Sequence, residues 1–282
     1  MAATQIHIDA KYSFLQHLAG RTHYHRDGPG DGCVVVMVCG ATLPLAVWEP
    51  LAQVLVDLGF QIVRYDLPGR GHTPLDGLGA DFRSHIDQLR LLIEGLGIQR
   101  PVRLIGLASG ALIVAAYAAG NRARVSHVGL IAPDGAVTHL TLAERLLSTP
   151  LGAALLRITN RRTLFARVPR YSSRLETQAF VGDLLSFNLH SSGFHDAVLE
   201  TIRTFPLHDG HAHYQRLSQA GVPTCVIWGR DDDITPPEGA GIMSGMFGEA
   251  SLHILENVGH LPFVEEPETV AKLLANHFGD EC

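Results

Sequence analysis

Short runs of apolar, β-branched residues alternate along this chain with longer stretches in which apolar residues recur at the spacing of a helix. The run CVVVMVC, at 33–39, is apolar at nearly every position, as expected of a strand buried on both faces of a sheet. Further strands are predicted at 60–66, 102–107, 125–133, 224–229 and 251–256. Helices are predicted between them at 48–58, 82–96, 109–120 and 269–278. This alternation predicts an α/β protein whose mostly parallel sheet is covered by helices on both faces.

The alternation stops between two of the core strands, where the chain has the pattern of one helix after another. One of these predicted helices is LETQAFVGDLLSFNL, at 175–189. The predicted organisation is a core domain formed by 1–137 and 218–282, with an inserted helical cap, or lid, at 138–217. We expect the cap to lie over the carboxyl edge of the sheet, because open α/β sheets bind their ligands at that edge.

The segment LIGLASGALIVAA predicts a strand, a very tight turn and a buried helix. A turn of this kind presents a nucleophile at its centre, requires tiny residues on both sides, and points the helix dipole at developing negative charge. Gly106 and Gly110 are the small residues, which places Ala108 at the centre. A register shifted by one residue would make Ser109 the nucleophile, but it needs a small residue where Leu107 stands. We therefore assign the nucleophile position to Ala108.

Two later segments complete a resemblance to the α/β-hydrolase superfamily that covers essentially the whole chain. WGRDDDITPP resembles the acid loop of that family, in which the acid stands three residues after a glycine, and this picks Asp232. ENVGHLPFVEEPE resembles the family's histidine loop and picks His260. The order of nucleophile position, acid and base is that of the family. The resemblance implies an α/β-hydrolase fold in which Asp232 is the catalytic acid and His260 the base.

In such a site, a buried Asp232 would fix the tautomer of His260, and His260 would take a proton from a nucleophile or from water. The alternative interpretations are that Asp232 caps a turn or helix and that His260 is a core histidine satisfied by the backbone. Asp231 and Asp233 are expected to be turn and surface residues. Asp134, which follows the strand predicted at 125–133, is either an alternative acid or a pocket residue.

The predicted oxyanion hole consists of two backbone N–H groups, those of Ala41 and Ser109. The family usually has His-Gly at the start of the first of these loops, so Cys39-Gly40 is a departure, although backbone donors tolerate it. We expect Cys39 to be inert packing because no base stands beside it. The residues expected to contact substrate flank these motifs: Gly40, Thr42, Leu107, Asp134 and Leu261.

A methyl group cannot attack a carbonyl, so Ala108 excludes a covalent acyl-enzyme in this chain. The first hypothesis is that this copy was inactivated by a Ser-to-Ala change in a hydrolase of carboxylic esters or lactones. The second is that the alanine is natural and the His260–Asp232 pair acts as a general base, in a lyase, isomerase, C–C hydrolase or cofactor-free oxygenase. The third is a small-molecule receptor. A further hypothesis is that the parent protein carried aspartate at position 108, the nucleophile that epoxide hydrolases and dehalogenases of this fold use.

Composition narrows the partners and the location. The 282 residues carry a formal net charge of -6 and no basic run, which argues against nucleic-acid binding. No apolar run reaches membrane-spanning length, and the N-terminus lacks the pattern of a signal peptide. The four scattered cysteines suit a reducing compartment. We therefore expect a cytoplasmic location. The sequence contains no cofactor-binding motif. We expect the cluster HDGHAH (208–213) to be a loop that returns from the cap to the core, and not a metal site. We expect a partly hydrophobic small-molecule substrate of medium size and no cofactor; nothing in the sequence indicates the oligomeric state.

Overall fold

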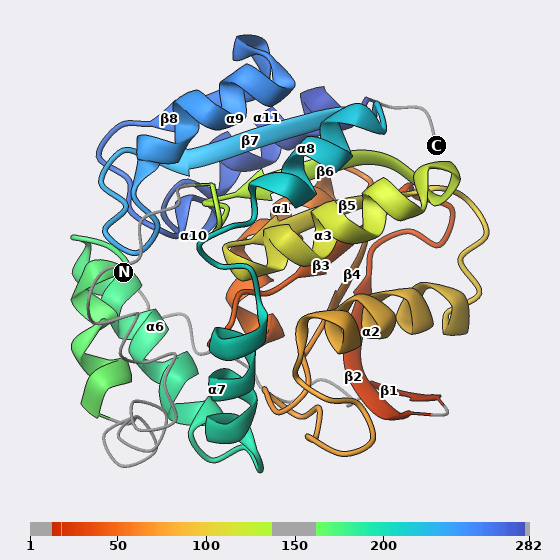
Figure 1. Ribbon diagram of the computed structural model, residues 1–282, viewed down its shortest axis with the longest axis vertical. Helices are drawn as coiled ribbons and strands as arrows, with labels where there is room; N and C mark the ends of the chain where they lie inside the picture. The colour runs from red at the N-terminus through yellow and green to blue at the C-terminus, as the bar shows by residue number, and fades with distance from the viewer. Residues whose placement is uncertain (1–12, 18, 137–161, 280–282) are drawn as a thin grey trace.

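A computed structural model describes residues 13–17, 19–136 and 162–279 of the chain (Figure 1). Its strands are β1 (Ser13–His17), β2 (Gly20–Asp27), β3 (Val34–Val38), β4 (Gln61–Tyr65), β5 (Val102–Leu107), β6 (Val125–Ile131), β7 (Thr224–Gly229) and β8 (Leu252–Leu255). Within the described residues they form one eight-stranded sheet in the order β1-β2-β4-β3-β5-β6-β7-β8. The strands from β4 to β8 along this order run parallel, so the predicted α/β fold with a mostly parallel sheet is confirmed.

Helices cover both faces of this sheet. The core helices are α1 (Glu49–Asp57), α2 (Phe82–Gly95), α3 (Ser109–Gly120), α8 (His211–Gln219), α9 (Ala240–Phe247), α10 (Pro262–Glu265) and α11 (Pro267–Phe278). In Figure 1, α3 and α8 lie side by side in front of the sheet and α11 lies behind it. Every residue of β4, β5 and β7 is buried because side chains on both faces of these strands meet helices.

The hairpin of β1 and β2 was not predicted. Its two strands pair antiparallel with each other, and β2 also pairs antiparallel with β4. The hairpin therefore forms one margin of the sheet. The sequence of β2, GRTHYHRD, is rich in arginine and histidine and lacks the apolar run by which the central strands were identified. Only two residues of β2, Thr22 and His23, are buried, so this part of the fold leaves a weaker signal in the sequence.

The described part of the predicted cap contains η3 (Val168–Arg170), α6 (Leu175–Asn188) and α7 (Phe194–Thr204). It lies over the loops that follow β3 and β4, because Asn188 at the end of α6 hydrogen-bonds to both loops. The first part of the predicted cap, from 138 to 161, is outside the described residues. The helix α8, which a cap boundary at 217 would divide, packs against α3 of the core. The domain boundaries therefore stay a prediction.

The remaining short elements are 3-10 turns: η1 (Leu45–Trp48), η2 (Arg122–Arg124), η4 (Pro237–Gly239) and η5 (Glu249–Ser251). The ring of Trp48, in η1, stacks on Phe263 of α10 at 4.3 Å between centroids, which joins the loop after β3 to the last part of the core. Over the described ranges, no helix has both the length and the apolar character needed to cross a lipid bilayer.

Candidate active site

Ala108 lies in a strained turn between β5 and α3. Its φ is 49° and its ψ is -116°, a region of backbone conformation that costs a residue with a side chain on the order of 1–3 kcal/mol. Three backbone hydrogen bonds hold it there. The N–H of Ala108 donates to the carbonyl of Ile131 at 3.0 Å, and its own carbonyl accepts from the N–H groups of Ala111 at 3.0 Å and Asp134 at 3.2 Å. The fold therefore maintains the strain from both sides of the turn.

The neighbours of this turn explain why both flanking residues are glycine. A Cβ on Gly106 would lie 2.6 Å from the carbonyl oxygen of Gly110, and a Cβ on Gly110 would lie 2.4 Å from that of Cys39. Ser109, by contrast, is the first residue of α3 and only 1% exposed, and its Oγ has no hydrogen-bond partner in the described part of the chain. The centre of the turn is therefore Ala108 and not Ser109.

The structure brings together the two residues predicted as acid and base. Nδ1 of His260 lies 2.9 Å from Oδ2 and 3.1 Å from Oδ1 of Asp232, and both residues are 3% exposed. A carboxylate accepts but does not donate, so Nδ1 of His260 carries the proton and Nε2 is left as an acceptor. Oδ1 of Asp232 also accepts from the N–H groups of Ile234 at 2.9 Å and Thr235 at 2.8 Å. Asp232 thus stabilises the turn after β7 as well as orienting His260.

Tyr171, which follows η3, contacts the histidine and was not predicted. Its carbonyl accepts from the N–H of His260 at 2.8 Å, and the two rings meet edge to face at 5.4 Å. Its hydroxyl lies 3.0 Å from Oγ1 of Thr42. A Cβ on Gly259 would lie only 2.4 Å from the Tyr171 carbonyl oxygen, so this approach requires glycine before the histidine. Tyr171 lies in an irregular segment between helices, where no periodic pattern distinguishes it.

The loop after β3, residues 39–44, passes beside the turn at Ala108. A Cβ on Gly40 would lie 3.5 Å from Cβ of Ala108 and 3.4 Å from the carbonyl oxygen of Leu107. The N–H of Ala41 has no acceptor among the residues that the structure describes. The N–H of Ser109 is in the first turn of α3, where N–H groups have no acceptor within their own helix. Two unused backbone donors therefore flank position 108.

Asp134 follows β6 and is also close to this turn. Its N–H donates to the carbonyl of Ala108, and its Oδ1 lies 3.4 Å from Oγ1 of Thr235 in the turn after β7. Burial raises the pKa of Asp134 above its ordinary value, and the nearby His260 and Arg167 oppose that rise. The Asp134 carboxyl group thus interacts electrostatically with the histidine, but it is Asp232 that accepts the short hydrogen bonds donated by Nδ1 of His260.

The remaining predicted site residues have different surroundings. Leu107 and Leu261 are 1% and 0% exposed and belong to the hydrophobic core, where they support the turn at Ala108 and the histidine loop. Cys39 is fully buried, and burial raises the pKa of its thiol well above the ordinary value, as expected of an inert packing residue. Cys33 is disulfide-bonded, although the four scattered cysteines led us to expect a reducing compartment. The cytoplasmic location stays a prediction.

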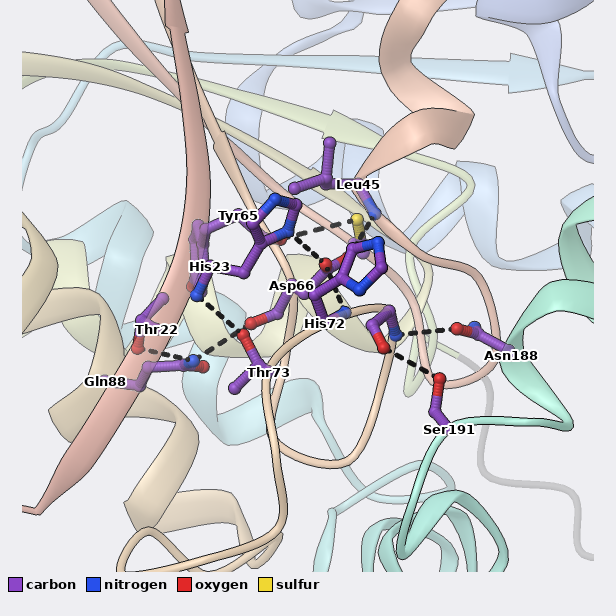
Figure 2. A network of polar contacts seen from close by, with 12 residues as sticks. Thr22, His23, Leu45, Tyr65, Asp66, His72, Thr73, Gln88, Asn188 and Ser191 are labelled. Carbon is purple, nitrogen blue, oxygen red and sulfur yellow. Dashed lines mark hydrogen bonds and ion pairs between the residues drawn. The ribbon is translucent and has the colours of Figure 1, made fainter. Parts of the chain in front are cut away.

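A second histidine–aspartate pair lies on the other side of the loop after β3. Nδ1 of His23 is 2.7 Å from Oδ2 of Asp66, and Asp66 also accepts from the backbone N–H groups of Leu45 at 2.7 Å and His72 at 3.0 Å (Figure 2). Both members of the pair are buried, at 2% and 1% exposure. Because Asp66 binds two backbone donors besides the histidine, the pair joins β2, the β3 loop and the β4 loop.

The histidine-rich segment at 208–213 has no metal-binding arrangement. His208 and Asp209 precede α8, whereas His211 and His213 lie in its first turn, so only half of the cluster is the loop that we predicted. Across the described ranges, no group of three or more histidine, cysteine, aspartate or glutamate side chains is placed to hold a metal ion.

Comparisons with known proteins agree with this fold. A model of the alpha/beta hydrolase fold family matches residues 34–267 of the chain. Monoacylglycerol lipase ABHD6 of Bos taurus is 24% identical over 282 residues, which cover 94% of this chain and 79% of the lipase. A 2-hydroxy-6-oxononadienedioate/2-hydroxy-6-oxononatrienedioate hydrolase of Pseudomonas putida is 26% identical over 269 residues, which cover 89% of each chain.

Among solved structures, a thermophilic esterase from Thermogutta terrifontis with bound malate superposes with a TM-score of 0.77. It is 22% identical in sequence, and the superposition covers 94% of this chain and 97% of the esterase. At this level of identity the likeness shows the fold and leaves the chemistry to be argued from the site.

Proposed function

This chain belongs to the alpha/beta hydrolase fold family, and we propose that its site is that of a hydrolase of carboxylic esters or lactones in which residue 108 is the nucleophile position. The observation that carries the proposal is the buried His260–Asp232 pair, on the loops after β8 and β7, together with a strained turn at Ala108 flanked by two unused backbone donors. A family fold alone does not fix a reaction, but this set of groups is what acyl transfer requires.

The proposed reaction needs serine at position 108. Its Oγ attacks the ester carbonyl carbon while Nε2 of His260 accepts the hydroxyl proton. The N–H groups of Ala41 and Ser109 donate to the oxyanion, and Asp232 stabilises the imidazolium. His260 then returns the proton to the leaving alcohol, and a water molecule activated by the same histidine hydrolyses the acyl-enzyme. The residues present in this chain supply every group that the proposed reaction uses except the attacking oxygen.

With alanine at 108 the chain lacks the attacking oxygen, so we propose that this copy is an inactivated form. Loss of a triad nucleophile lowers kcat on the order of a million-fold in a well-studied serine protease, and only binding and the oxyanion hole remain. The retained parts support this interpretation: Gly106, Gly110, Asp232 and His260 keep the geometry that a nucleophile at 108 would use.

The proposed substrate is an ester of medium size with a partly hydrophobic acyl group. Support comes from the named activities of the similar proteins, a monoacylglycerol lipase and an esterase, and from the apolar residues of the cap helices α6 and α7. Phe180 and Phe187 of α6 are only partly buried, as expected of side chains that could face a substrate.

A second candidate is a natural enzyme without a nucleophile, in which the histidine pair acts as a general base on water or on a carbon acid. The observation in its favour is that the His260–Asp232 pair is intact in a chain whose residue 108 is alanine. A non-catalytic receptor would have no need of a buried carboxylate on the histidine, so we rank it below both.

The experiment is covalent labelling with an alkyl fluorophosphonate, which reacts only with an activated serine. The chain as it stands and the variants Ala108→Ser, Ala108→Ser/His260→Ala and Ala108→Asp are compared by intact-mass and peptide mass spectrometry. The proposal predicts one adduct, on residue 108 of Ala108→Ser, that is lost with His260→Ala. If Ala108→Ser is folded but takes no label, the ester proposal fails; turnover of an epoxide or haloalkane by Ala108→Asp would then favour an aspartate nucleophile.

A further inference from the structure

The guanidinium of Arg70 is completely buried and connects the β3 loop to the cap. Arg70 is 0% exposed and follows β4. Its Nε donates to the carbonyl of Ala41 at 2.9 Å and its Nη1 to that of Pro68 at 2.7 Å. Its Nη2 donates to Oγ1 of Thr201 at 2.7 Å and to the carbonyl of Ala197 at 3.3 Å, both in α7. One side chain therefore binds the residue after Gly40 and a helix of the cap at the same time.

All four of these acceptors are neutral, and within the described residues no carboxylate forms an ion pair with Arg70. Burial lowers the pKa of Arg70 to about 9, so the group is still a cation at neutral pH. The Glu200 carboxylate opposes this lowering of the pKa, but the hydrogen bonds of the guanidinium all go to neutral acceptors, and only a planar group with donors on several sides can satisfy these acceptors together. The arrangement is specific to arginine.

Asn188, the last residue of α6, binds the carbonyl of Thr42, which follows the Ala41 carbonyl that Arg70 binds. It is 0% exposed, and its Nδ2 donates to the carbonyl of Thr42 at 2.8 Å. Its Oδ1 accepts from the N–H of Gly71 at 2.7 Å. Figure 2 shows Asn188 and Ser191 reaching the same loop after β4; the hydroxyl of Ser191 donates to the carbonyl of Gly71 at 2.7 Å.

These contacts restrain the backbone around Ala41 from its carboxyl side. Peptide groups are planar, so fixing the carbonyls of Ala41 and Thr42 fixes two consecutive peptide planes. The residue on the other side, Gly40, has no side chain and its backbone is intrinsically permissive. The direction of the Ala41 N–H therefore depends on the restraints that follow it.

We propose that Arg70 and Asn188 are positioning residues, through which the cap sets the direction of the Ala41 N–H toward the reacting carbonyl. The inference rests on the proposed function, because it assumes that this N–H is an oxyanion donor. It goes further in assigning the cap a part in transition-state stabilisation besides binding substrate. A donor must lie within a few tenths of an ångström of its place to stabilise an oxyanion, so a small movement of the loop has a large effect on rate.

Three variants distinguish the contacts that restrain the β3 loop from a contact of the cap that does not involve this loop. Asn188→Asp keeps an oxygen for the Gly71 N–H but replaces the donor to Thr42. Thr201→Val removes the shorter of the two hydrogen bonds from Arg70 to the cap with little change of shape, and leaves the longer one to the Ala197 carbonyl. Ser191→Ala is the matched control, because it removes a bond of the cap to Gly71 that does not involve the β3 loop.

The first readout is amide hydrogen exchange of the chain as it stands, followed in a peptide that spans residues 39–45. We expect exchange in this peptide to be about tenfold faster in Asn188→Asp and in Thr201→Val, while Ser191→Ala leaves it unchanged. Exchange in β5 is the internal reference. If the peptide exchanges at the same rate in all four proteins, or equally fast in all three variants, the proposal is overturned.

The second readout is steady-state ester hydrolysis with each change added to Ala108→Ser. We expect kcat to fall at least about tenfold for Asn188→Asp and Thr201→Val, with KM within about twofold, because an oxyanion donor acts in the transition state. Unchanged kcat in an active Ala108→Ser protein overturns the positioning role. If Ala108→Ser itself is folded and inactive, the proposed function fails, and with it the catalytic part of this inference; the exchange data then decide only whether the cap restrains the loop.

Discussion

The backbone N–H of His260 donates a 2.8 Å hydrogen bond to the carbonyl of Tyr171, so a residue of the predicted cap holds the predicted catalytic base. The same tyrosine reaches Thr42 through its hydroxyl at 3.0 Å. The histidine loop and the β3 loop, which are more than two hundred residues apart in the sequence, are thus joined through one residue. The described part of the predicted cap therefore contributes to the geometry of the histidine loop.

The Tyr171–Thr42 contact gives a prediction about stability that does not depend on activity. Tyr171→Phe and Thr42→Val should each lower the free energy of unfolding by about 1 kcal/mol, because each removes one partner of a part-buried hydrogen bond. The double variant should lose little more than either single one, as expected of two residues that share one interaction. Urea unfolding of the four proteins measures this cycle; strictly additive losses would show that the hydroxyls do not interact.

The choice of acid gives a second prediction. In the Ala108→Ser background, Asp232→Asn should lower kcat on the order of ten-thousand-fold, because it removes the acceptor that fixes the tautomer of His260. Asp134→Asn is the matched control and should lower kcat by less than about tenfold, since its carboxyl group makes no hydrogen bond to His260 in the described structure. The rates of ester hydrolysis by the two variants decide which carboxylate is the acid. A larger fall in kcat for Asp134→Asn than for Asp232→Asn would identify Asp134 as the acid.

Acid stability is predicted to depend on His85 of α2. The side chain is fully buried, its Nδ1 donates to the carbonyl of Asp81 at 2.8 Å, and burial, with a smaller effect of Arg70, lowers its pKa to about 3. Between about pH 6.5 and pH 3 the unfolded chain binds a proton that the folded chain does not, so stability is lost as the pH falls.

The variant His85→Asn keeps a donor for the Asp81 carbonyl and does not titrate. We expect the slope of the unfolding free energy against pH, between about pH 6 and 4, to be smaller in this variant by up to about 1.4 kcal/mol per pH unit. Urea titrations at a series of pH values measure the slope. The same slope in both proteins would show that His85 takes up its proton in the folded state.

Glycine positions around the turn at Ala108 give a prediction about packing. Gly106→Ala should destabilise the fold by about 1–3 kcal/mol or more, because the new Cβ would lie 2.6 Å from the carbonyl oxygen of Gly110. Gly182→Ala, within α6, is the control: its Cβ meets nothing within 4 Å, and alanine should stabilise the helix by about 0.5–1 kcal/mol. Thermal unfolding measures whether each variant is less or more stable than the chain as it stands. Unchanged stability of Gly106→Ala would mean that the turn relaxes to accept the new Cβ.

The central strands and the turn at Ala108 could be predicted from the sequence because their signals are local. Strands such as β5 are apolar along their whole length, and the glycine pair around Ala108 has a steric reason that the structure makes explicit. Asp232 and His260 follow strands whose ends meet at one edge of a parallel sheet, so their placement follows from topology. The order of motifs therefore carried most of the information about the site.

The contacts of the cap could not be predicted in this way. Tyr171, Asn188 and Arg70 act through hydrogen bonds between segments that no periodicity relates. The β1–β2 hairpin was missed because β2 is rich in histidine and arginine and the edge strand β1 is short, so neither strand has an apolar run. Interactions of this kind depend on tertiary packing and become visible only when the chain is folded.

The most direct test of the account is the rate of hydrolysis of p-nitrophenyl esters of graded chain length by Ala108→Ser beside the chain as it stands. We predict that Ala108→Ser gains several orders of magnitude in kcat/KM, on the order of 10³ or more, and that His260→Ala removes the gain. A folded Ala108→Ser protein that hydrolyses these esters no faster than the alanine form would contradict the assignment of residue 108 as the nucleophile position of an ester hydrolase.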